Sequence, residues 1–543
     1  MAEHMTGGQA IVRTLTRHGI DTIFGLPGVQ LDNTFDALYE ARNVIRTVHT
    51  RHEQAAGYMA LGYAQASGRV GACIVGPGPG LLNAGAAIAT ASGSNAPVLC
   101  IAGQIPSSQI GSGMGMTHEI RDQTAAMRGV AKWVGRAETP EAAPEVLDEA
   151  FEQMLGGRHQ PVVFEMAPDI MGASADVALC DARSYRHDPQ FDEAELEEAS
   201  VLLGQAEKPA IFVGSGIFGA EAELLRVAEM LEAPVIMSRT GRGALSDRHY
   251  LAQIMISGQE LWEEVDVALV VGTRFSAPGL SWGRQDKVKL VRIDIDPDQA
   301  SKPRAADVTL IAQAATALDG LAKRIGPHNR QRTSREEELR AAKRRALDKL
   351  ATLQPQYGFA QVIREAMSDD GIVVTDVTQM ASFLQNWMPI FAPRTLITPG
   401  YQATLGMGVP TALGAKLACP DRKVICVSGD GGFMFNVQEL STAVAHDIDV
   451  TIVVFNDGAY GNVKRYQKES YGGRYIGVDL HNPDLVMLGR SFGMTALRAA
   501  TPEALRDAFH EAEEKAGPAL IDVPFKEVPS IWKLIRRPSS AAN

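Results

Sequence analysis

The chain has 543 residues, of which 45% are hydrophobic and 21% charged, so it is long enough for three or four globular domains with sizeable cores. Its net charge of −12, without a long basic run, excludes nucleic acid and acidic membrane surfaces as main partners. Five scattered cysteines without a CxxC pair, no signal-like stretch at the N-terminus and no membrane-length apolar run favour a cytoplasmic protein that acts on small molecules.

The first 185 residues alternate short apolar runs with amphipathic stretches, and Gly or Pro separates most of them. The runs have the length of buried parallel strands and occupy residues 22–24, 45–48, 72–75, 98–102 and 162–166. Strands that alternate with helices predict a doubly wound parallel sheet. Residues 1–185 are therefore expected to form an N-terminal α/β domain.

The same alternation recurs twice more along the chain. Apolar runs at residues 210–213, 234–237, 267–271 and 290–295 predict a middle domain over residues 190–325. The charge-rich segment 326–352 is expected to be a solvated linker helix. A last domain over residues 353–543 is predicted from runs at 372–375, 395–397, 424–427, 450–455 and 520–523. The predicted fold class is α/β, with three doubly wound parallel-sheet domains.

In the last domain, two apolar strands each end in polar residues. Gly-Asp-Gly-Gly at residues 429–432 follows the first strand, and Asn-Asp-Gly at residues 456–458 follows the second, with one helix between them. A right-handed crossover makes these strands parallel neighbours, so Asp430 and Asn456 should emerge side by side at their carboxyl ends. A carboxylate, an amide oxygen and the Gly458 carbonyl suit Mg²⁺. The helix N-terminus after the glycines suits a phosphate.

This arrangement resembles the thiamine diphosphate (ThDP) motif, in which Gly-Asp-Gly is followed after one helix and one strand by Asn. The resemblance bears on Glu53, which lies just beyond the strand at residues 45–48 and precedes a small-residue helix. Its position alone is typical of a solvated residue that caps the helix. In a ThDP enzyme, a glutamic acid pairs with the aminopyrimidine ring and favours the tautomer that takes the thiazolium proton. Acid–base help of this kind is typically worth ~10²–10⁴-fold.

The resemblance extends over nearly the whole chain and narrows to the acetolactate synthase (acetohydroxyacid synthase) group of ThDP enzymes. It is carried by residues 25–28, 51–60, 76–80, 97–104 and 404–410, together with the motif at 429–456. It implies an N-terminal pyrimidine-binding domain, a middle domain that is a degenerate dinucleotide-binding fold, and a C-terminal diphosphate-binding domain. In that group ThDP binds between subunits, which implies a homodimer or homotetramer. Nothing in the sequence identifies a regulatory subunit.

Carried over position by position, the resemblance implies a role for each residue of the site. Glu53 activates the cofactor, and Asp430, Asn456 and the Gly458 carbonyl hold Mg²⁺. Leu405 takes the place of the apolar residue, usually Met, that holds the cofactor bent. The remaining expected cofactor contacts are Gly78, Asn83, Gln379, Tyr401, Gly429, Gly431, Gly432, Ala459 and Tyr460.

Two positions of the N-terminal domain depart from the family pattern and bear on the reaction. Residues 6–35 also resemble benzaldehyde lyase, whose active-site histidine is replaced here by Gln30, whereas Tyr401 matches a tyrosine of that lyase. His118 stands where both groups carry glutamine, and it is either structural or a proton-transfer residue. Gln30 and His118 are therefore expected to join Glu53 as catalytic residues. The His-His pair of pyruvate decarboxylases is absent, which disfavours release of a free aldehyde.

Two further segments carry open interpretations. Gly214 to Gly219 spell GxGxxG directly after a strand, which by itself indicates a dinucleotide site. Residues 240–243 and 272–275 resemble the FAD-binding members of the family. Residues 254–262 lack the glycine-rich Met-His turn of those members, which disfavours FAD and leaves the question open. In the tail, Trp532 either packs onto the surface or belongs to a lid over the mouth of the active site.

The sequence therefore predicts a ThDP- and Mg²⁺-dependent enzyme that makes or breaks a C–C bond next to a carbonyl. The preferred interpretation is an acetolactate-synthase-like enzyme that decarboxylates a 2-oxo acid and joins the product to a second carbonyl. The alternative is a non-decarboxylating lyase, carboligase or hydrolase that acts on hydroxyketones or diones. An alternative of another class is a flavin or nicotinamide oxidoreductase that uses the middle domain.

Overall fold

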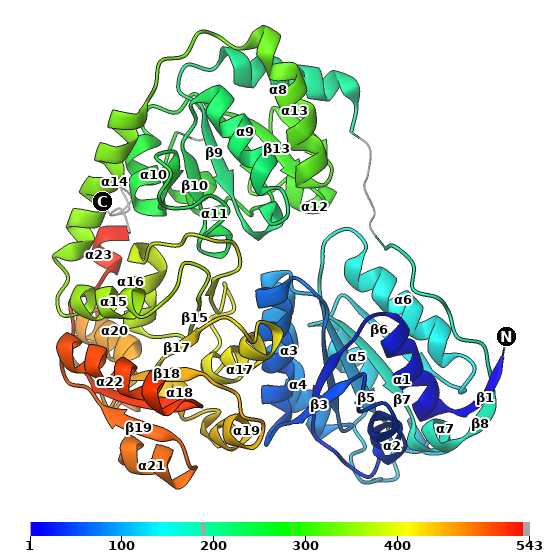
Figure 1. Cartoon of the computed structure of the whole chain (residues 1–543). Helices are drawn as coiled ribbons and strands as arrows, with labels where there is room; N and C mark the ends of the chain where they lie inside the picture. The colour runs from blue at the N-terminus through cyan, green and yellow to red at the C-terminus, as the bar shows by residue number, and fades with distance from the viewer. Residues whose placement is uncertain (1, 186–190, 285, 536–543) are drawn as a thin grey trace.

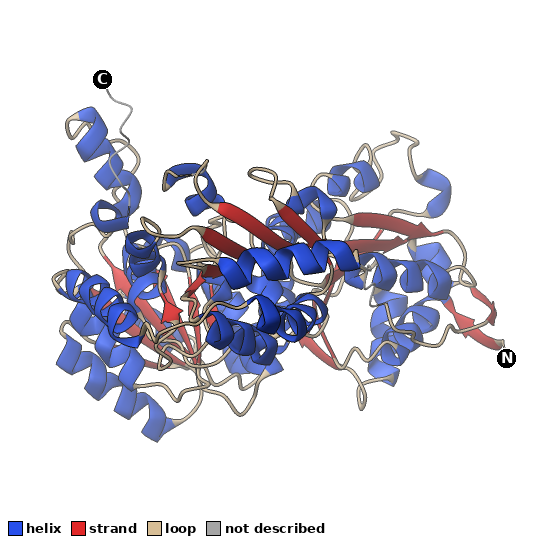
Figure 2. Ribbon diagram, turned by 90° about the horizontal axis from the view of Figure 1, so that it is seen from above, coloured by secondary structure: helices blue, strands red, loops and turns tan. Residues whose placement is uncertain are grey.

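The computed structural model describes residues 2–185, 191–284 and 286–535, and it arranges them in three α/β domains (Figure 1). Each domain holds one six-stranded sheet whose paired strands are all parallel. Helices flank the sheets on both sides (Figure 2). The predicted fold class is thereby confirmed.

The N-terminal sheet has the strand order β3-β2-β4-β5-β7-β6. Its strands are β2 (Thr22–Gly25), β3 (Arg46–His49), β4 (Gly71–Val75), β5 (Val98–Gly103), β6 (Trp133–Ala137) and β7 (Val162–Met166). A separate antiparallel pair joins β1 (Glu3–Thr6) to β8 (Ser174–Val177). The helices are α1 (Gly7–Arg17), α2 (Asp32–Glu40), α3 (Glu53–Ser67), α4 (Pro79–Ser94), α5 (Gln123–Arg128), α6 (Ala143–Leu155) and α7 (Pro168–Gly172).

The middle sheet has the order β11-β10-β9-β12-β13-β14. Its strands are β9 (Ala210–Val213), β10 (Val235–Met237), β11 (Ala252–Gln253), β12 (Val267–Val271), β13 (Lys289–Asp294) and β14 (Val308–Ile311). The helices are α8 (Glu193–Gln205), α9 (Glu221–Leu231), α10 (Met255–Leu261), α11 (Ser276–Ser281), α12 (Pro297–Ala300) and α13 (Ala314–His328). Helix α14 (Glu336–Ala351) leads into the last domain.

The C-terminal sheet has the order β16-β15-β17-β18-β20-β19. Its strands are β15 (Ile372–Thr375), β16 (Leu396–Ile397), β17 (Val424–Gly429), β18 (Thr451–Asn456), β19 (Thr495–Arg498) and β20 (Ala519–Pro524). The helices are α15 (Gln356–Glu365), α16 (Gln379–Trp387), α17 (Gly408–Ala418), α18 (Asp430–Phe433), α19 (Leu440–Ala445), α20 (Gly461–Tyr471), α21 (Leu485–Ser491), α22 (Pro502–Lys515) and α23 (Trp532–Ile535).

In the three large sheets, the strands that no apolar run predicted all lie at edges: β6, β11, β14 and β19. Four of the five residues of β6 are only half-buried, and β14 alternates buried with half-buried positions. A continuous apolar run is expected only where helices cover both faces of a strand. The three partly exposed strands, β6, β14 and β19, lack such a run, and β11 has only two residues, whereas the edge strands β3 and β16 were predicted.

The N-terminal and C-terminal domains are joined where α3 crosses α17 (Figure 1). A Cβ atom on Gly62 would stand 2.0 Å from the carbonyl oxygen of Thr411, and one on Gly414 would stand 1.9 Å from that of Met59. Glycines at both positions therefore let the two backbones touch. Side chains from both domains form one continuous hydrophobic core around this crossing.

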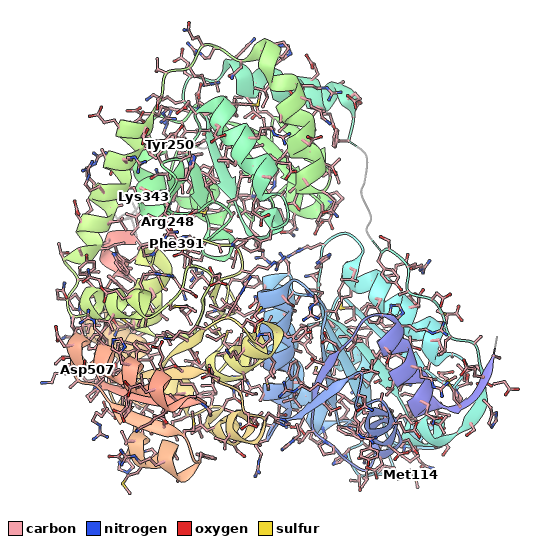
Figure 3. The ribbon with its side chains drawn as sticks, viewed as in Figure 1. Met114, Arg248, Tyr250, Lys343, Phe391 and Asp507 are labelled. Atoms are coloured by element: carbon pink, nitrogen blue, oxygen red, sulfur yellow. The ribbon has the colours of Figure 1, made fainter. Side chains whose placement is uncertain are left out.

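The predicted solvated linker helix exists as α14, but one of its faces is buried. Leu339 and Ala342 pack into the core of the middle domain, whereas Ala346 and Leu350 pack into that of the C-terminal domain. Lys343 donates to the carbonyls of Asp247 (2.9 Å) and His249 (3.4 Å), and burial lowers its pKa to about 8. Figure 3 shows Lys343 beside Arg248 and Tyr250. The expectation of a solvated helix was wrong because the apolar positions are too few to stand out among the charges.

No helix of the described residues is long and apolar enough to cross a membrane.

The α3–α17 crossing predicts a strong effect of Gly62→Ala. The added methyl group has no room against the Thr411 backbone, so we expect a loss of about 1–3 kcal/mol in the free energy of unfolding. The control is Gly85→Ala in α4, where a Cβ meets nothing within 4 Å and the effect should stay within about 1 kcal/mol. Thermal unfolding of both variants checks this, and equal stabilities would contradict the close crossing.

Candidate active site

At the carboxyl end of the C-terminal sheet, Asp430 and Asn456 lie side by side. Strands β17 and β18 are parallel neighbours, and the first ends directly before Asp430 while the second ends at Asn456. The side-chain amide of Asn482 donates to Asp430 Oδ2 at 2.6 Å and to Asn456 Oδ1 at 3.1 Å. One amide group therefore holds the two oxygens within a few ångströms of each other.

A second set of contacts orients Asn456. Its Nδ2 donates to Asp522 Oδ1 at 3.2 Å, and Arg498 Nε donates to the other oxygen of Asp522 at 3.0 Å. Because the amide nitrogen is engaged by Asp522, the amide oxygen of Asn456 is turned toward Asp430.

Asp457 adds a second carboxyl group beside Asp430. Burial and the neighbouring Asp430 carboxylate raise the pKa of Asp457 to about 7. Two adjacent carboxyl groups repel each other unless a proton or a cation lies between them. The donor set of carboxylate and amide oxygens is the one that a hard divalent cation prefers, so these residues fit Mg²⁺.

The Gly458 carbonyl, the third expected ligand, accepts a hydrogen bond from the Leu480 N–H at 2.8 Å. A carbonyl oxygen has a second lone pair that a cation could use. The described residues contain no cluster of three His, Cys, Asp or Glu side chains suited to a metal ion. Any metal site at this position therefore depends on amide and carbonyl oxygens.

The helix expected after the Gly-Asp-Gly turn is broken into pieces. Helix α18 ends at Phe433, a 3₁₀ turn spans Val437–Glu439, and α19 begins only at Leu440. A four-residue helix has a small dipole, so any phosphate at this turn would be held mainly by the backbone N–H groups. The sequence predicted one helix between the two strands, and the structure has two short ones, α18 and α19.

The other expected contacts of this half surround the same turn. The Tyr460 ring lies 2.9 Å from where a Cβ on Gly431 would stand, and Asp376 crowds Gly432 in the same way. A Cβ on Gly461 would meet Asp457 Oδ2 and the amide nitrogen of Gln379. Leu405 is half-buried in the turn before α17, and Ala459 is buried.

Glu53 lies in the N-terminal half of the site, at the start of α3. The helix is capped by His52, whose side chain accepts from the Gln54 N–H, so Glu53 is not the cap. Asn83 Nδ2 donates to Glu53 Oε2 at 3.0 Å, and a Cβ on Gly80 would stand 3.3 Å from Oε1. The structure thus brings Glu53 and Asn83 together at the glycine-rich turn before α4.

Gly78 and His118 meet at the same turn. A Cβ on Gly78, whose φ is +55°, would stand 2.1 Å from the carbonyl oxygen of His118. The Gly78 N–H donates to Gln123, whose amide in turn donates to the buried Glu165. The side chain of His118 is exposed, on a loop whose Met114 lies at the lower edge of the domain in Figure 3.

Gln30 lies in the turn after β2, where its carbonyl oxygen is 3.4 Å from where a Cβ on Gly103 would stand. The turn therefore sits at the carboxyl ends of β2 and β5. Gln30 and His118 both belong to loops on this edge of the N-terminal sheet.

The residues expected at one site fall into two sets with different contacts. The contacts of Glu53 come from the N-terminal domain, and those of Asp430 come from the C-terminal domain. We call them the N-terminal and C-terminal half-sites.

A cavity of about 760 Å³ lies between the three domains. It opens at the carboxyl ends of β9 and β12, which are neighbours although the chain continues from them in opposite directions. Such a switch point is where open α/β sheets bind ligands. The cavity is lined by Gly214, Ser215 and Gly216 of the GxGxxG segment and by Arg158, Arg239, Arg274 and Arg394, with Asp294 as its acidic side chain.

Two residues with other expected roles also line this cavity. Tyr401 is stacked under the guanidinium group of Arg274, whose Cζ lies 4.5 Å from the centre of the ring. Its contacts therefore belong to this cavity. Trp532 and Ile535 of α23 border the cavity as well, and Trp532 packs against the core of the C-terminal domain. Helix α23 therefore borders the cavity between the three domains.

Asn482 and Asp522 were not expected from the sequence. No motif marks Asn482, because it comes from the loop before α21 and reaches the site only through the fold. Asp457 could have been proposed from the sequence, since it is adjacent to Asn456 and a carboxylate is a common metal ligand.

Comparisons with known proteins agree with this geometry. Residues 5–126, 196–321 and 376–523 match the N-terminal TPP binding, central and C-terminal TPP binding domains of thiamine pyrophosphate enzymes. The chain is 32% identical to a probable acetolactate synthase large subunit of Methanocaldococcus jannaschii over 97% of this chain and 93% of that protein. It is 31% identical to the acetolactate synthase large subunit of Corynebacterium glutamicum, over 100% of this chain and 90% of that protein.

A relative with a different name is similar to the same extent. The chain is 32% identical to a probable 2-ketoarginine decarboxylase of Pseudomonas aeruginosa, over 96% of this chain and 94% of that protein.

The Asn482 bridge predicts that Asn482→Ala weakens divalent-cation binding. Without the shared amide, the Asp430 and Asn456 oxygens lose the contact that keeps them together. We therefore expect the affinity for Mg²⁺ to fall by about 10–100-fold. Calorimetric titration of ThDP at several Mg²⁺ concentrations measures it. Asn329→Ala, which removes an amide bonded to Met230 in the middle domain, is the control. An unchanged Mg²⁺ affinity in Asn482→Ala would contradict this role of Asn482.

Proposed function

This chain belongs to the family of thiamine pyrophosphate enzymes and is acetolactate synthase-like, and we propose its reaction on that basis. We propose that it binds ThDP with Mg²⁺, decarboxylates a 2-oxo acid and joins the product to a second carbonyl compound. The supporting observation is the pair of oxygens from Asp430 and Asn456, bridged by Asn482 at the carboxyl ends of adjacent parallel strands.

The C-terminal half would hold the metal and the diphosphate. Asp430 and Asn456 supply side-chain oxygens to Mg²⁺, and the Gly458 carbonyl supplies a third. The remaining positions of the ion are left for phosphate oxygens and water. Gly431 and Gly432, which have no room for side chains, let the backbone N–H groups come close to the phosphates.

The N-terminal half would supply the proton chemistry. When bound, ThDP provides the carbon nucleophile and the electron sink for cleavage of the C–C bond. Glu53 holds a proton at the aminopyrimidine ring, and the Asn83 amide orients its Oε2. Gln30 and His118 lie on loops at the same sheet edge, where they can contact the substrate.

Because one chain holds two separate half-sites, we propose that the working enzyme is at least a homodimer. Glu53 of one subunit would then face Asp430 of another.

The alternative substrate class is hydroxyketones or diones, without decarboxylation. Gln30 in the turn after β2 is the departure that supports it. The relative named as a 2-ketoarginine decarboxylase also indicates that donors differ within the family.

The test is CO₂ release from pyruvate by the purified protein with ThDP and Mg²⁺, followed by identification of the products. Acetolactate as product would support the synthase, and a free aldehyde would support a simple decarboxylase. If ThDP binds but no CO₂ is released from a panel of 2-oxo acids, the decarboxylating function is wrong, and hydroxyketones and diones become the substrates to assay.

Glu53→Gln should retain ThDP binding but lose at least about 10²-fold in turnover, because the amide cannot serve as the acid. Glu40→Gln, on the surface beside Gln9, is the matched control and should keep full activity. Calorimetry measures the binding and steady-state assays measure the turnover. Full activity of Glu53→Gln would contradict the assigned role.

A second binding function is supported by the cavity at the switch point of the middle sheet. Its four lining arginines suit the diphosphate of a nucleotide, either FAD or a nucleoside diphosphate. Against the dinucleotide interpretation, a Cβ on Gly214 or Gly216 would meet the backbone of Gly272, so packing alone explains these two glycines.

Arg274→Gln should weaken binding of ADP or FAD at least about 10-fold, because it removes one of the charges that face the cavity. Arg226→Gln, on the surface of the middle domain, is the control. Calorimetric titration measures the binding, and the absorption spectrum of the purified protein reports any retained flavin. Absence of binding by the unmodified protein to both compounds would exclude the nucleotide site.

A further inference from the structure

The carboxyl group of Asp376 is buried where three segments of the C-terminal domain meet. Asp376 follows β15 directly and is 1% exposed. Its Oδ1 accepts from the backbone N–H groups of Val377 (2.7 Å) and Gly406 (3.2 Å). Its Oδ2 accepts from the Gly408 N–H (3.0 Å) and the Ser428 hydroxyl (3.3 Å). Within the described part of the chain, no Lys, Arg or His lies within ion-pair distance of it.

Four donors surround this carboxyl group, two at each oxygen. An ionised carboxylate has the lone pairs to accept all four bonds. Three of the donors are backbone N–H groups, which can only donate, whereas the Ser428 hydroxyl can instead donate to the Gly429 carbonyl at 3.1 Å. Burial raises the pKa of Asp376, and the four hydrogen bonds act in the opposite direction. The pKa of Asp376 is raised overall because burial is the larger effect, whereas the three backbone N–H groups favour the ionised form.

The donors belong to the segments that carry the proposed cofactor contacts. Val377 leads into α16, which begins at Gln379. Gly406 and Gly408 flank Met407 in the turn that follows Leu405. Ser428 precedes the Gly-Asp-Gly turn that contains Asp430. One carboxylate thus connects three pieces of chain that are far apart in sequence.

The packing around Asp376 leaves little freedom. A Cβ on Gly432 would stand 3.1 Å from the carboxyl group, and one on Gly408 would stand 2.9 Å from Oδ2. On the other side of the turn, Asn436 Nδ2 donates to the Gly406 carbonyl at 2.7 Å. Gly406, with φ of +84°, is held through its N–H by Asp376 and through its carbonyl by Asn436.

We propose that Asp376 is a positioning residue, which holds the Leu405 turn in place against the Gly-Asp-Gly turn before any cofactor binds. The role toward ThDP rests on the proposed function. The role in fixing the turn does not, because its contacts are all within this chain. Asn436 is the second support of the same turn.

The experiment compares the unmodified full-length protein with Asp376→Asn. The amide has one acceptor oxygen and one NH₂ donor, so in either orientation its NH₂ group faces at least one backbone N–H donor. In the protein without cofactor, we expect the Gly406 and Gly408 amide hydrogens to exchange at least about 10-fold faster in the variant. We also expect ThDP affinity at fixed Mg²⁺ to fall by about 10–100-fold. Hydrogen exchange with mass spectrometry and calorimetry measure the two effects.

The matched control is Asp247→Asn, the same change at a buried carboxyl group that accepts from Arg242 and from the Ile390 N–H. It should leave exchange at Gly406 and Gly408 and the ThDP affinity unchanged. Asn436→Ala should accelerate exchange within the same turn while it keeps the Asp376 carboxylate.

Wild-type exchange rates and wild-type ThDP affinity in Asp376→Asn would overturn the proposal. If that variant does not fold, exchange in the unmodified cofactor-free protein decides the matter. Protected Gly406 and Gly408 amides support the proposal, and exchange at the rate of an open loop overturns it. If the unmodified protein binds no ThDP, the proposed function fails, whereas the exchange data still test what Asp376 does to the turn.

Discussion

The arrangement of the chain depends on the close crossing of α3 and α17. Gly62 and Gly414 allow two backbones to touch, and the cores of the first and last domains become continuous around them. Helix α3 begins with Glu53, and α17 begins directly after the turn that carries Leu405. The crossing therefore sets where both half-sites face.

The C-terminal half-site contains several acidic side chains, and they differ in what compensates their charge. Asp522 pairs with Arg498, and Asp376 is surrounded by four hydrogen-bond donors. Asp430 is held by Asn482, and Asp457, beside it, has a raised pKa. The first two charges are satisfied within the protein. The last two accept hydrogen bonds from Asn482 and from the Ala459 N–H but form no ion pair among the described residues, and Asp430 is a ligand of the proposed Mg²⁺ site.

The sequence-based view failed where burial was partial or where a contact bridged distant segments. Strands β6, β14 and β19 were missed because they are only partly buried, and β11 was missed because it has only two residues. Helix α14 was expected to be solvated because its charged residues outnumber the four that pack into two cores. One helix was expected after the Gly-Asp-Gly turn, and the structure has two short helices with Asn436 between them, whose side chain holds Gly406. Tyr401 and Trp532 border the cavity between the domains, a location that no local pattern indicates.

By itself, the sequence determined the fold class, the ThDP family and the meeting of Asp430 with Asn456. It could do so because buried parallel strands have a local apolar signature and a right-handed crossover brings consecutive strand ends together. Only the tertiary structure decided that Asn482 bridges the two oxygens, that Asp376 connects three segments and that Glu53 contacts Asn83 and does not cap its helix. These contacts join residues that lie far apart in the chain. A hydrogen bond between such residues depends on how whole elements pack, and single-sequence patterns carry no record of that packing.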